Sequence, residues 1–123
     1  MPDSKPSMIY LDDEEINLLF FGEMFKEDFE IFTTSSPKEA IQYLEDNPVD
    51  FVLTDQLMPE MTGVEFLEEL KSQNVASASK KVMVSGYAKA GEVKKAIEEQ
   101  LIDEFVSKPW DYDSLVSVIK KLE

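Results

Sequence analysis

Five side chains that can take part in phosphoryl chemistry lie at the ends of short apolar runs that are far apart along the chain. They are Asp12 and Asp13 after the first run, Asp55 after the third, Ser85 after the fourth and Lys108 after the fifth. A carboxylate beside a bound cation can attack phosphorus, and an ammonium or a hydroxyl can stabilise phosphoryl oxygens. If the fold brings these side chains together, the sequence predicts a site for phosphoryl transfer.

Three carboxylates in one shallow pocket would repel one another. Each pair about 4 Å apart costs roughly 1 kcal/mol in water and up to about 4 kcal/mol at an effective dielectric constant of 20. A cation must therefore neutralise the acids, or their pKa values must rise. Mg²⁺ prefers oxygen ligands and keeps several waters, so it suits an open acidic cluster better than a closed calcium site would. The cluster predicts Mg²⁺ as the cofactor.

Alternating strands and helices would position these residues. Short runs rich in β-branched and aromatic residues alternate with longer stretches of helical period, which is the pattern of repeated βα units. Ser36 before Pro37, with Glu39 three residues after Ser36, predicts an N-cap and a capping box at one helix start. The expected strands are 8–11, 29–33, 49–54, 82–84 and 105–106, and the expected helices are 16–26, 37–45, 64–72, 91–101 and 111–122.

Five such units in 123 residues predict one domain, 1–123, of the α/β class. A closed eightfold barrel needs about 250 residues, so the expected architecture is an open, doubly wound parallel sheet with helices on both faces. In such a sheet the ligand site lies beyond the carboxyl ends of the strands, where the strand order reverses. The candidate residues follow the predicted strands at that edge.

Composition excludes several classes of function. The chain has no cysteine and no histidine, which rules out disulfides, thiolate zinc sites, Ser-His-Asp triads and phosphorylation of a histidine of its own. With 26 acidic and 12 basic residues, the net charge of −14 argues against direct binding to nucleic acid or anionic lipid. No apolar run approaches the roughly 20 residues of a membrane span, and the start lacks a signal peptide, so a cytoplasmic location is expected.

Four short motifs occur in the order and at the strand ends of a known family. They are LDDE at 11–14, TD at 54–55 followed by MPEMTG at 58–63, VSGYA at 84–88 and VSKP at 106–109. Together they resemble the receiver domain of bacterial two-component response regulators, over essentially the whole chain. The resemblance implies a flavodoxin-like (βα)₅ fold with strand order 2-1-3-4-5. It also implies a signalling switch rather than an enzyme, with Mg²⁺-dependent self-phosphorylation and autodephosphorylation only.

The resemblance also implies a role for individual residues. Asp55 would be the phosphoacceptor, and Lys108 would contact the phosphoryl group and be joined to Pro109 by a cis bond. The implied switch pair is Ser85 with Phe105, where the family commonly has tyrosine. The implied ligands of Mg²⁺ are Asp12, Asp13, Asp55 and the backbone carbonyl of Leu57. The implied partners are a sensor histidine kinase or a histidine phosphotransfer protein, with an output partner or attached domain that the sequence does not identify.

Structural roles explain some of these residues equally well when each is taken alone. Asp12 and Asp13 could cap the helix that follows them, because Asp is a favoured N-cap. Lys108 could be a surface lysine, and Ser85-Gly86 an ordinary turn. Capping does not explain why two strand ends are acidic and a third carries lysine. The coincidence favours the phosphoryl site.

The helix expected at 16–26 has more apolar residues than one buried face requires. Its predicted core stripe is Asn17, Phe20, Phe21 and Met24. The apolar residues in excess are Ile16, Leu18, Leu19 and Phe25. Neighbouring helices could cover them, or they could form a docking site for a partner's helices. The family resemblance favours docking, with Leu18 and Leu19 as the candidate residues.

Three alternative functions make different demands on the sequence. A flavodoxin-type flavin carrier needs a phosphate loop rich in Ser, Thr and Gly after the first strand, whereas residues 12–15 are all acidic. A phosphatase with an aspartate nucleophile needs a second acid two residues after the first, but position 57 is leucine. A receiver-like interaction module that is never phosphorylated stays open.

Overall fold

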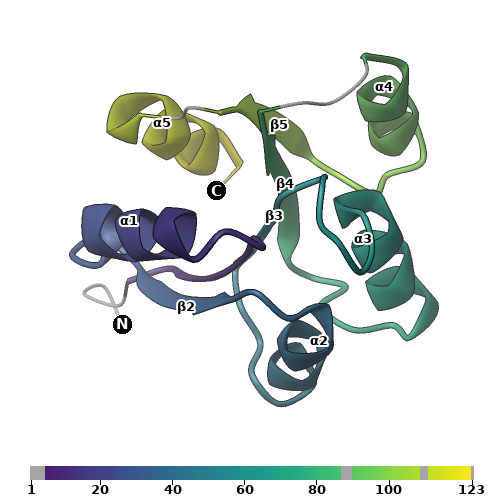
Figure 1. Ribbon diagram of the computed structural model, residues 1–123, viewed down its shortest axis with the longest axis horizontal. Helices are drawn as coiled ribbons and strands as arrows, with labels where there is room; N and C mark the ends of the chain where they lie inside the picture. The colour runs from purple at the N-terminus through teal and green to yellow at the C-terminus, as the bar shows by residue number, and fades with distance from the viewer. Residues whose placement is uncertain (1–4, 87–89, 109–110, 123) are drawn as a thin grey trace.

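Five parallel strands form one sheet in the order β2-β1-β3-β4-β5, which confirms the predicted architecture and strand order (Figure 1). The computed structural model describes residues 5–86, 90–108 and 111–122, without the side chains of residues 90 and 92. The strands are β1 (Ser7–Leu11), β2 (Glu30–Thr34), β3 (Phe51–Thr54), β4 (Lys80–Ser85) and β5 (Glu104–Ser107).

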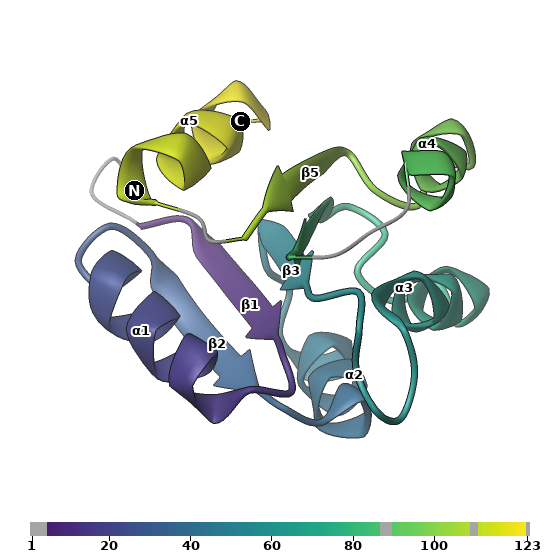
Figure 2. The ribbon, with the colours of Figure 1, turned by 45° about the horizontal axis from the view of Figure 1, so that its top comes forward.

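Helices cover both faces of the sheet (Figure 2). They are α1 (Glu15–Phe25), α2 (Pro37–Asp46), α3 (Gly63–Ser72), α4 (Ala90–Glu98) and α5 (Tyr112–Leu122). Helices α1 and α5 pack on one face around a core that includes Phe21 and Leu115, whereas α2, α3 and α4 pack on the other face around a core that includes Leu44 and Phe66. In the described part of the chain, no helix combines the length and the apolar character that crossing a bilayer requires.

Helix α4 ends at Glu98, three residues before the predicted end. Gln100 has a positive φ of 61°, its N–H donates to the Ile97 carbonyl, and the Leu101 N–H donates to the Ala96 carbonyl. These two bonds form a Schellman motif, which usually has glycine at the positive-φ position. Glutamine does not signal such an end, which is why the helical pattern of the sequence runs past it.

The capping box forms at a different helix from the predicted one. The Ser36 hydroxyl does accept a hydrogen bond from the Glu39 N–H at 3.2 Å, but the Glu39 carboxylate accepts from Thr34 instead of from Ser36. The complete box lies at the start of α3, where Thr62 and Glu65 bond reciprocally at 2.8 and 3.1 Å. This box fixes the start of the helix that follows Asp55.

The predicted core stripe of α1 is confirmed for Phe21 but wrong for Phe20 and Met24. Phe21 and Phe25 are buried, whereas Phe20 is 57% exposed and Met24 is 41% exposed. Phe25, predicted as surplus, stacks on the Tyr112 ring of α5 with the ring centroids 5.4 Å apart. The sequence did not identify the buried face because apolar residues occur around most of this helix.

Candidate functional site

An acidic pocket lies at the carboxyl ends of β1 and β3, which are neighbours in the sheet. Leu11 pairs with Thr54 at the last position of both strands, so the residues that follow emerge side by side. Asp12, Asp13 and Asp55 each offer one carboxylate oxygen, and these oxygens all lie within 4.8 Å of one another. The structure therefore brings together three acids that are up to 43 positions apart in the sequence.

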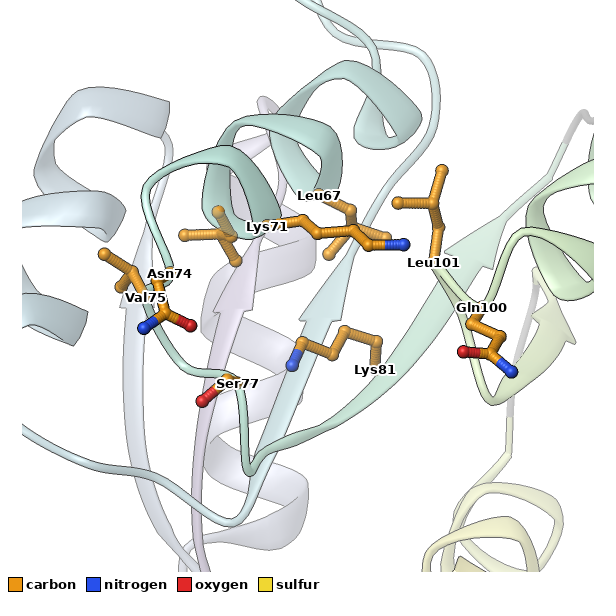
Figure 3. Close-up of a pocket in the computed structure, with 9 residues that line it drawn as sticks. Leu67, Lys71, Asn74, Val75, Ser77, Lys81, Gln100 and Leu101 are labelled. Atoms are coloured by element: carbon orange, nitrogen blue, oxygen red, sulfur yellow. The ribbon is translucent and has the colours of Figure 1, made fainter.

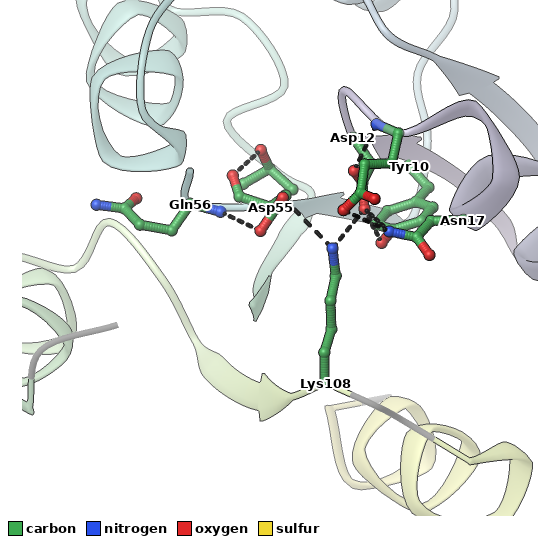
Figure 4. Close-up of polar contacts among 8 residues, drawn as sticks. Tyr10, Asp12, Asn17, Asp55, Gln56 and Lys108 are labelled. Carbon is green, nitrogen blue, oxygen red and sulfur yellow. Dashed lines mark hydrogen bonds and ion pairs between the residues drawn. The ribbon is translucent and has the colours of Figure 1, made fainter. Parts of the chain in front are cut away.

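Asp12 is fully buried, and its carboxylate accepts four hydrogen bonds (Figure 4). Three donors converge on Oδ2: the Tyr10 hydroxyl at 2.6 Å, Lys108 Nζ at 2.7 Å and Asn17 Nδ2 at 3.3 Å. The Glu14 N–H donates to Oδ1 at 3.0 Å. The N-cap residue of α1 is Glu14 rather than Asp12 or Asp13, so capping alone does not account for the buried carboxylate.

Asp55 is 5% exposed and is held from two sides. Its carboxylate accepts from the Gln56 N–H at 2.8 Å through Oδ1, and Oδ2 lies 3.3 Å from Lys108 Nζ. Burial raises the pKa of the Asp55 carboxyl, because it removes water from the charged form. Lys108 opposes that rise, the negative charge of Asp12 adds to it, and the net shift of the pKa is upward.

Lys108 connects the two buried acids. Its N–H donates to the Ser85 carbonyl at 3.0 Å, which ties its backbone to the end of β4, and its side chain is only 17% exposed. Burial alone would lower the pKa of this ammonium, but hydrogen bonds and charge attraction from Asp12 and Asp55 outweigh it and raise the pKa. Lys108 is therefore a fixed positive charge in the pocket rather than a solvated surface lysine.

Ser85 and Phe105 lie on the neighbouring strands β4 and β5. Ser85 is buried at the end of β4, and Phe105 on β5 is half-buried against the core formed with α2, α3 and α4. The Leu57 side chain is 51% exposed in the loop after Asp55. Pro109, and with it the predicted cis bond to Lys108, lies outside the described residues.

The loop that follows Asp55 is folded back tightly on itself. Gln56 fastens it twice: its carbonyl accepts from the Gly63 N–H and its side-chain oxygen accepts from the Val64 N–H, both at 2.9 Å. A Cβ atom on Gly63 would collide with the backbone carbonyl of Asp55. Glycine is therefore required at position 63 for the close approach that orients Asp55.

Tyr10, Asn17 and Gln56 are site residues that the sequence motifs did not predict. Tyr10 had a usable signal, because residues i and i+2 of a strand point to the same side and Tyr10 precedes Asp12 by two. Asn17 was predicted to face the core, but it is half-buried and reaches Asp12. Nothing in the sequence around Gln56 distinguishes it from an ordinary loop residue.

The donor set fits a magnesium ion. All three acids provide hard oxygen ligands, and Asp13 is exposed, which leaves one side of the cluster open to water and to an incoming phosphoryl group. A groove of about 800 Å³ adjoins the pocket and is lined in part by Phe20, Met24, Gly86 and Lys108. The arrangement can hold a cation, present a carboxylate nucleophile and stabilise phosphoryl oxygens.

A second cavity, of about 200 Å³, lies beside α3 and the start of β4 (Figure 3). Lys81 lines it, and its ammonium donates to the carbonyls of Ala76 and Ser79, in the latter case at 2.8 Å. Burial lowers the pKa of Lys81. The residues that line this cavity include no carboxylate, so it lacks the nucleophile and the metal ligands that the acidic pocket provides.

Comparisons with known proteins agree with this geometry. The family model of the response regulator receiver domain matches residues 8–120. The hydrogenase transcriptional regulatory protein HoxA of Cupriavidus necator is 31% identical to the chain over 121 residues, which are 98% of this chain and 25% of HoxA. The chain thus spans about a quarter of the length of this relative.

Solved structures share the fold. A CheY-like response regulator receiver domain protein from Methanospirillum hungatei is 26% identical, with a TM-score of 0.84 over 97% of this chain and 94% of that one. The chemotaxis protein CheY4 of Vibrio cholerae is 16% identical, with a TM-score of 0.88 over 98% of this chain and 100% of that one. The family model covers nearly the whole chain, and the acidic pocket lies at the carboxyl ends of β1 and β3, as the motifs predict. The chain therefore belongs to the response regulator receiver domain family of two-component systems.

Proposed function

We propose that the chain, acting as one unit over residues 1–123 in the cytoplasm, takes a phosphoryl group from a partner's phosphohistidine onto Asp55 with Mg²⁺. Membership of the family makes it a signalling module rather than a metabolic enzyme and implies a histidine kinase as partner. The observation that carries the proposal is the convergence of Asp12, Asp13, Asp55 and Lys108 in one pocket. Phosphorylation would then change the surface offered to an output partner.

The three acids would hold the metal, with the Leu57 carbonyl as a further proposed ligand. The ion, when bound, supplies positive charge that offsets the acids and the incoming phosphoryl oxygens. An Asp55 oxygen attacks phosphorus as the P–N bond to the partner's imidazole breaks, and the bonding electron pair stays on the imidazole nitrogen. Lys108 already lies 3.3 Å from Asp55 Oδ2 and is placed to bond a phosphoryl oxygen.

The switch we propose involves Ser85 and Phe105. The Ser85 hydroxyl would move toward the phosphoryl group and leave space into which Phe105 turns. This movement biases two pre-existing states of the molecule and alters the surface of α4, β5 and α5. The half-buried position of Phe105 supports the proposal, because a ring at that depth can move inward or outward without refolding its strand.

Intact-mass measurement after incubation with acetyl phosphate and Mg²⁺ tests the phosphoacceptor. The native chain should gain one phosphoryl group, Asp55→Asn should gain none, and the exposed-acid control Asp46→Asn should behave like the native chain. Omitting Mg²⁺ should abolish the gain. If the native chain gains nothing, the interaction module that is never phosphorylated becomes the better explanation.

Helix α1 offers the surface on which the partner's phosphohistidine-bearing helices would dock. Ile16, Leu19, Phe20 and Met24 are exposed apolar residues on this helix, and the groove that Phe20 and Met24 line continues to Lys108. A partner seated there would present its phosphohistidine next to Asp55. Of the two predicted docking residues, Leu19 is 59% exposed, whereas Leu18 is half-buried against the core under α1 and α5.

A further inference from the structure

The Tyr10 hydroxyl makes the shortest of the hydrogen bonds to Asp12, and the proposed reaction gives it no role so far. It donates to Asp12 Oδ2 at 2.6 Å from the strand that precedes the pocket, and Tyr10 is 0% exposed (Figure 4). A tyrosine hydroxyl bonded to an ionised carboxylate is a strong, charge-assisted contact. The residue lies directly beneath the acid cluster.

The Tyr10 ring is held in place by α1. Its centroid lies 4.4 Å from that of Phe21, which in turn lies 4.9 Å from that of Phe25, and all three rings are buried. A tyrosine side chain has only two rotatable bonds before the hydroxyl. Once the ring is packed, the direction of the hydroxyl toward Asp12 is set by the core and not by the pocket.

Lys108 contacts two carboxylates at once, those of Asp12 and Asp55. It lies 2.7 Å from Asp12 and 3.3 Å from Asp55, so moving toward a phosphoryl group on Asp55 takes it away from Asp12. A fully buried carboxylate that loses a donor incurs a desolvation penalty unless other donors remain. Tyr10 and Asn17 are the donors that remain on Oδ2, beside the Glu14 N–H on Oδ1, and Tyr10 makes the shortest of these bonds.

We propose that Tyr10 is a positioning residue, which holds the Asp12 carboxylate in orientation for the metal and keeps it hydrogen-bonded when Lys108 turns to the phosphoryl group. The inference rests on the proposed function. Without the hydroxyl, the Asp12 side chain is freer to rotate and depends more on Lys108. Metal binding weakens as a result, and Lys108 becomes harder to withdraw.

Tyr10→Phe tests this role, because it removes the hydroxyl and keeps the packed ring. Calorimetric titration with Mg²⁺ should show an increase in Kd of about tenfold, the lower end of what loss of an outer hydrogen bond to a metal ligand costs. Tyr112→Phe is the matched control: its hydroxyl also donates to an aspartate, Asp28, at 2.6 Å, but at an exposed place outside the pocket. The control should bind Mg²⁺ with native affinity.

A second variant and a rate measurement separate positioning from general damage. Asn17→Ala removes the longer donor bond at the rim of the pocket and should weaken Mg²⁺ binding in the same direction but less. In Tyr10→Phe, phosphorylation by acetyl phosphate should be slower than in the native chain, and raising the Mg²⁺ concentration should recover part of the rate. Native Mg²⁺ affinity in Tyr10→Phe would overturn the role of Tyr10, as would equal weakening in Tyr112→Phe. Absence of Mg²⁺ binding by the native chain would instead overturn the proposed function.

Discussion

Asp55 combines two properties that oppose each other. It must be deprotonated to attack phosphorus, yet burial and the neighbouring Asp12 charge raise its pKa above the ordinary 3.8. Lys108 and the Gln56 N–H offset part of that rise, and bound Mg²⁺ would offset more. The negative charge of Asp55 therefore destabilises the folded chain until a bound cation neutralises it or the carboxylate is phosphorylated.

Replacing Asp55 with asparagine should stabilise the metal-free protein at neutral pH. Because the folded-state pKa is raised, the folded chain binds the proton more tightly, so stability falls as pH rises from 3.8 through the folded-state pKa. Asparagine keeps the shape and removes the charge. We expect the Tm in EDTA at pH 7 to rise by roughly 4 °C, on the order of 1 kcal/mol for a chain of this size.

Differential scanning calorimetry of Asp55→Asn and the exposed control Asp46→Asn measures this effect. The control should leave the free energy of unfolding within about 0.5 kcal/mol of native. The difference between Asp55→Asn and the native chain should shrink as pH falls and disappear well below pH 3.8, where Asp55 is protonated in both the folded and the unfolded state. A lower Tm for Asp55→Asn at pH 7 would mean that the attraction to Lys108 outweighs burial.

Residues with unusual chemistry were predictable from the sequence, and their supporting neighbours were not. Asp12, Asp55 and Lys108 stood out because charged residues at the ends of buried strands need a reason. Tyr10 did not stand out, because tyrosine is common in strands and its place two residues before Asp12 indicates only that the two side chains lie on the same side of the strand. The bond to Asp12 depends on the packing against Phe21, which only the structure reveals.

Among the structural elements, the loop between β3 and α3 decides where Asp55 lies. Gly63→Ala would drive a methyl group into the Asp55 carbonyl, so the loop must shift. We expect destabilisation of about 1–3 kcal/mol, as for other overpacked sites, together with slower phosphorylation by acetyl phosphate. Denaturant unfolding and the phosphorylation rate measure the two effects.

Gly22→Ala provides the control for this substitution. Gly22 lies inside α1, and a Cβ there would meet nothing within 4 Å. Alanine favours a helix interior over glycine by about 0.5–1 kcal/mol, so this variant should be more stable than native. If both variants gain stability, the close approach at Gly63 is not the constraint that the structure indicates.

Substitutions at two adjacent residues of α1, Leu18 and Leu19, should distinguish partner docking from folding. Leu19→Asp places a charge on the exposed face and should slow transfer from a partner's phosphohistidine at least tenfold while sparing acetyl phosphate. Leu18→Asp places a charge against the core, so it should lower stability and impair both reactions. Ile97→Asp, an exposed apolar position on α4, should affect neither donor. Equal loss with both donors in Leu19→Asp would refute docking at this residue.

The order of strands and helices was predictable from hydrophobic periodicity and strand composition. The buried face of a single helix and the position of the capping box were not. The buried face of α1 could not be chosen from a helix that has Ile16, Leu19, Phe20, Phe21 and Phe25 on several sides. The capping box at Thr62 and Glu65 has the same pattern as the one predicted at Ser36 and Glu39. Which box closes depends on whether the glutamate has a better partner, as Glu39 does in Thr34.

The molecule as a whole carries far more negative than positive charge. The net charge is −14, and the ion pairs at Lys26 and Lys95 are solvent-exposed pairs that contribute little. Self-repulsion on this scale destabilises the compact state. The net negative charge also favours approach by a partner with a basic surface. Inside the pocket, Lys108 supplies a positive charge that offsets part of the negative charge around it.

Monovalent salt should therefore stabilise the protein. Raising sodium chloride from 0.01 to 0.15 M shortens the Debye length from about 30 to about 8 Å, which screens repulsion across the molecule. We expect the Tm, measured in EDTA, to rise by roughly 4 °C, on the order of 1 kcal/mol. Potassium chloride should act alike, because screening depends on ionic strength.

Without EDTA and at equal ionic strength, magnesium chloride should raise the Tm further by binding the folded pocket, and Asp13→Asn should reduce that extra rise. A Tm that falls with sodium chloride would mean that local ion pairs, rather than net charge, dominate the electrostatics of this fold.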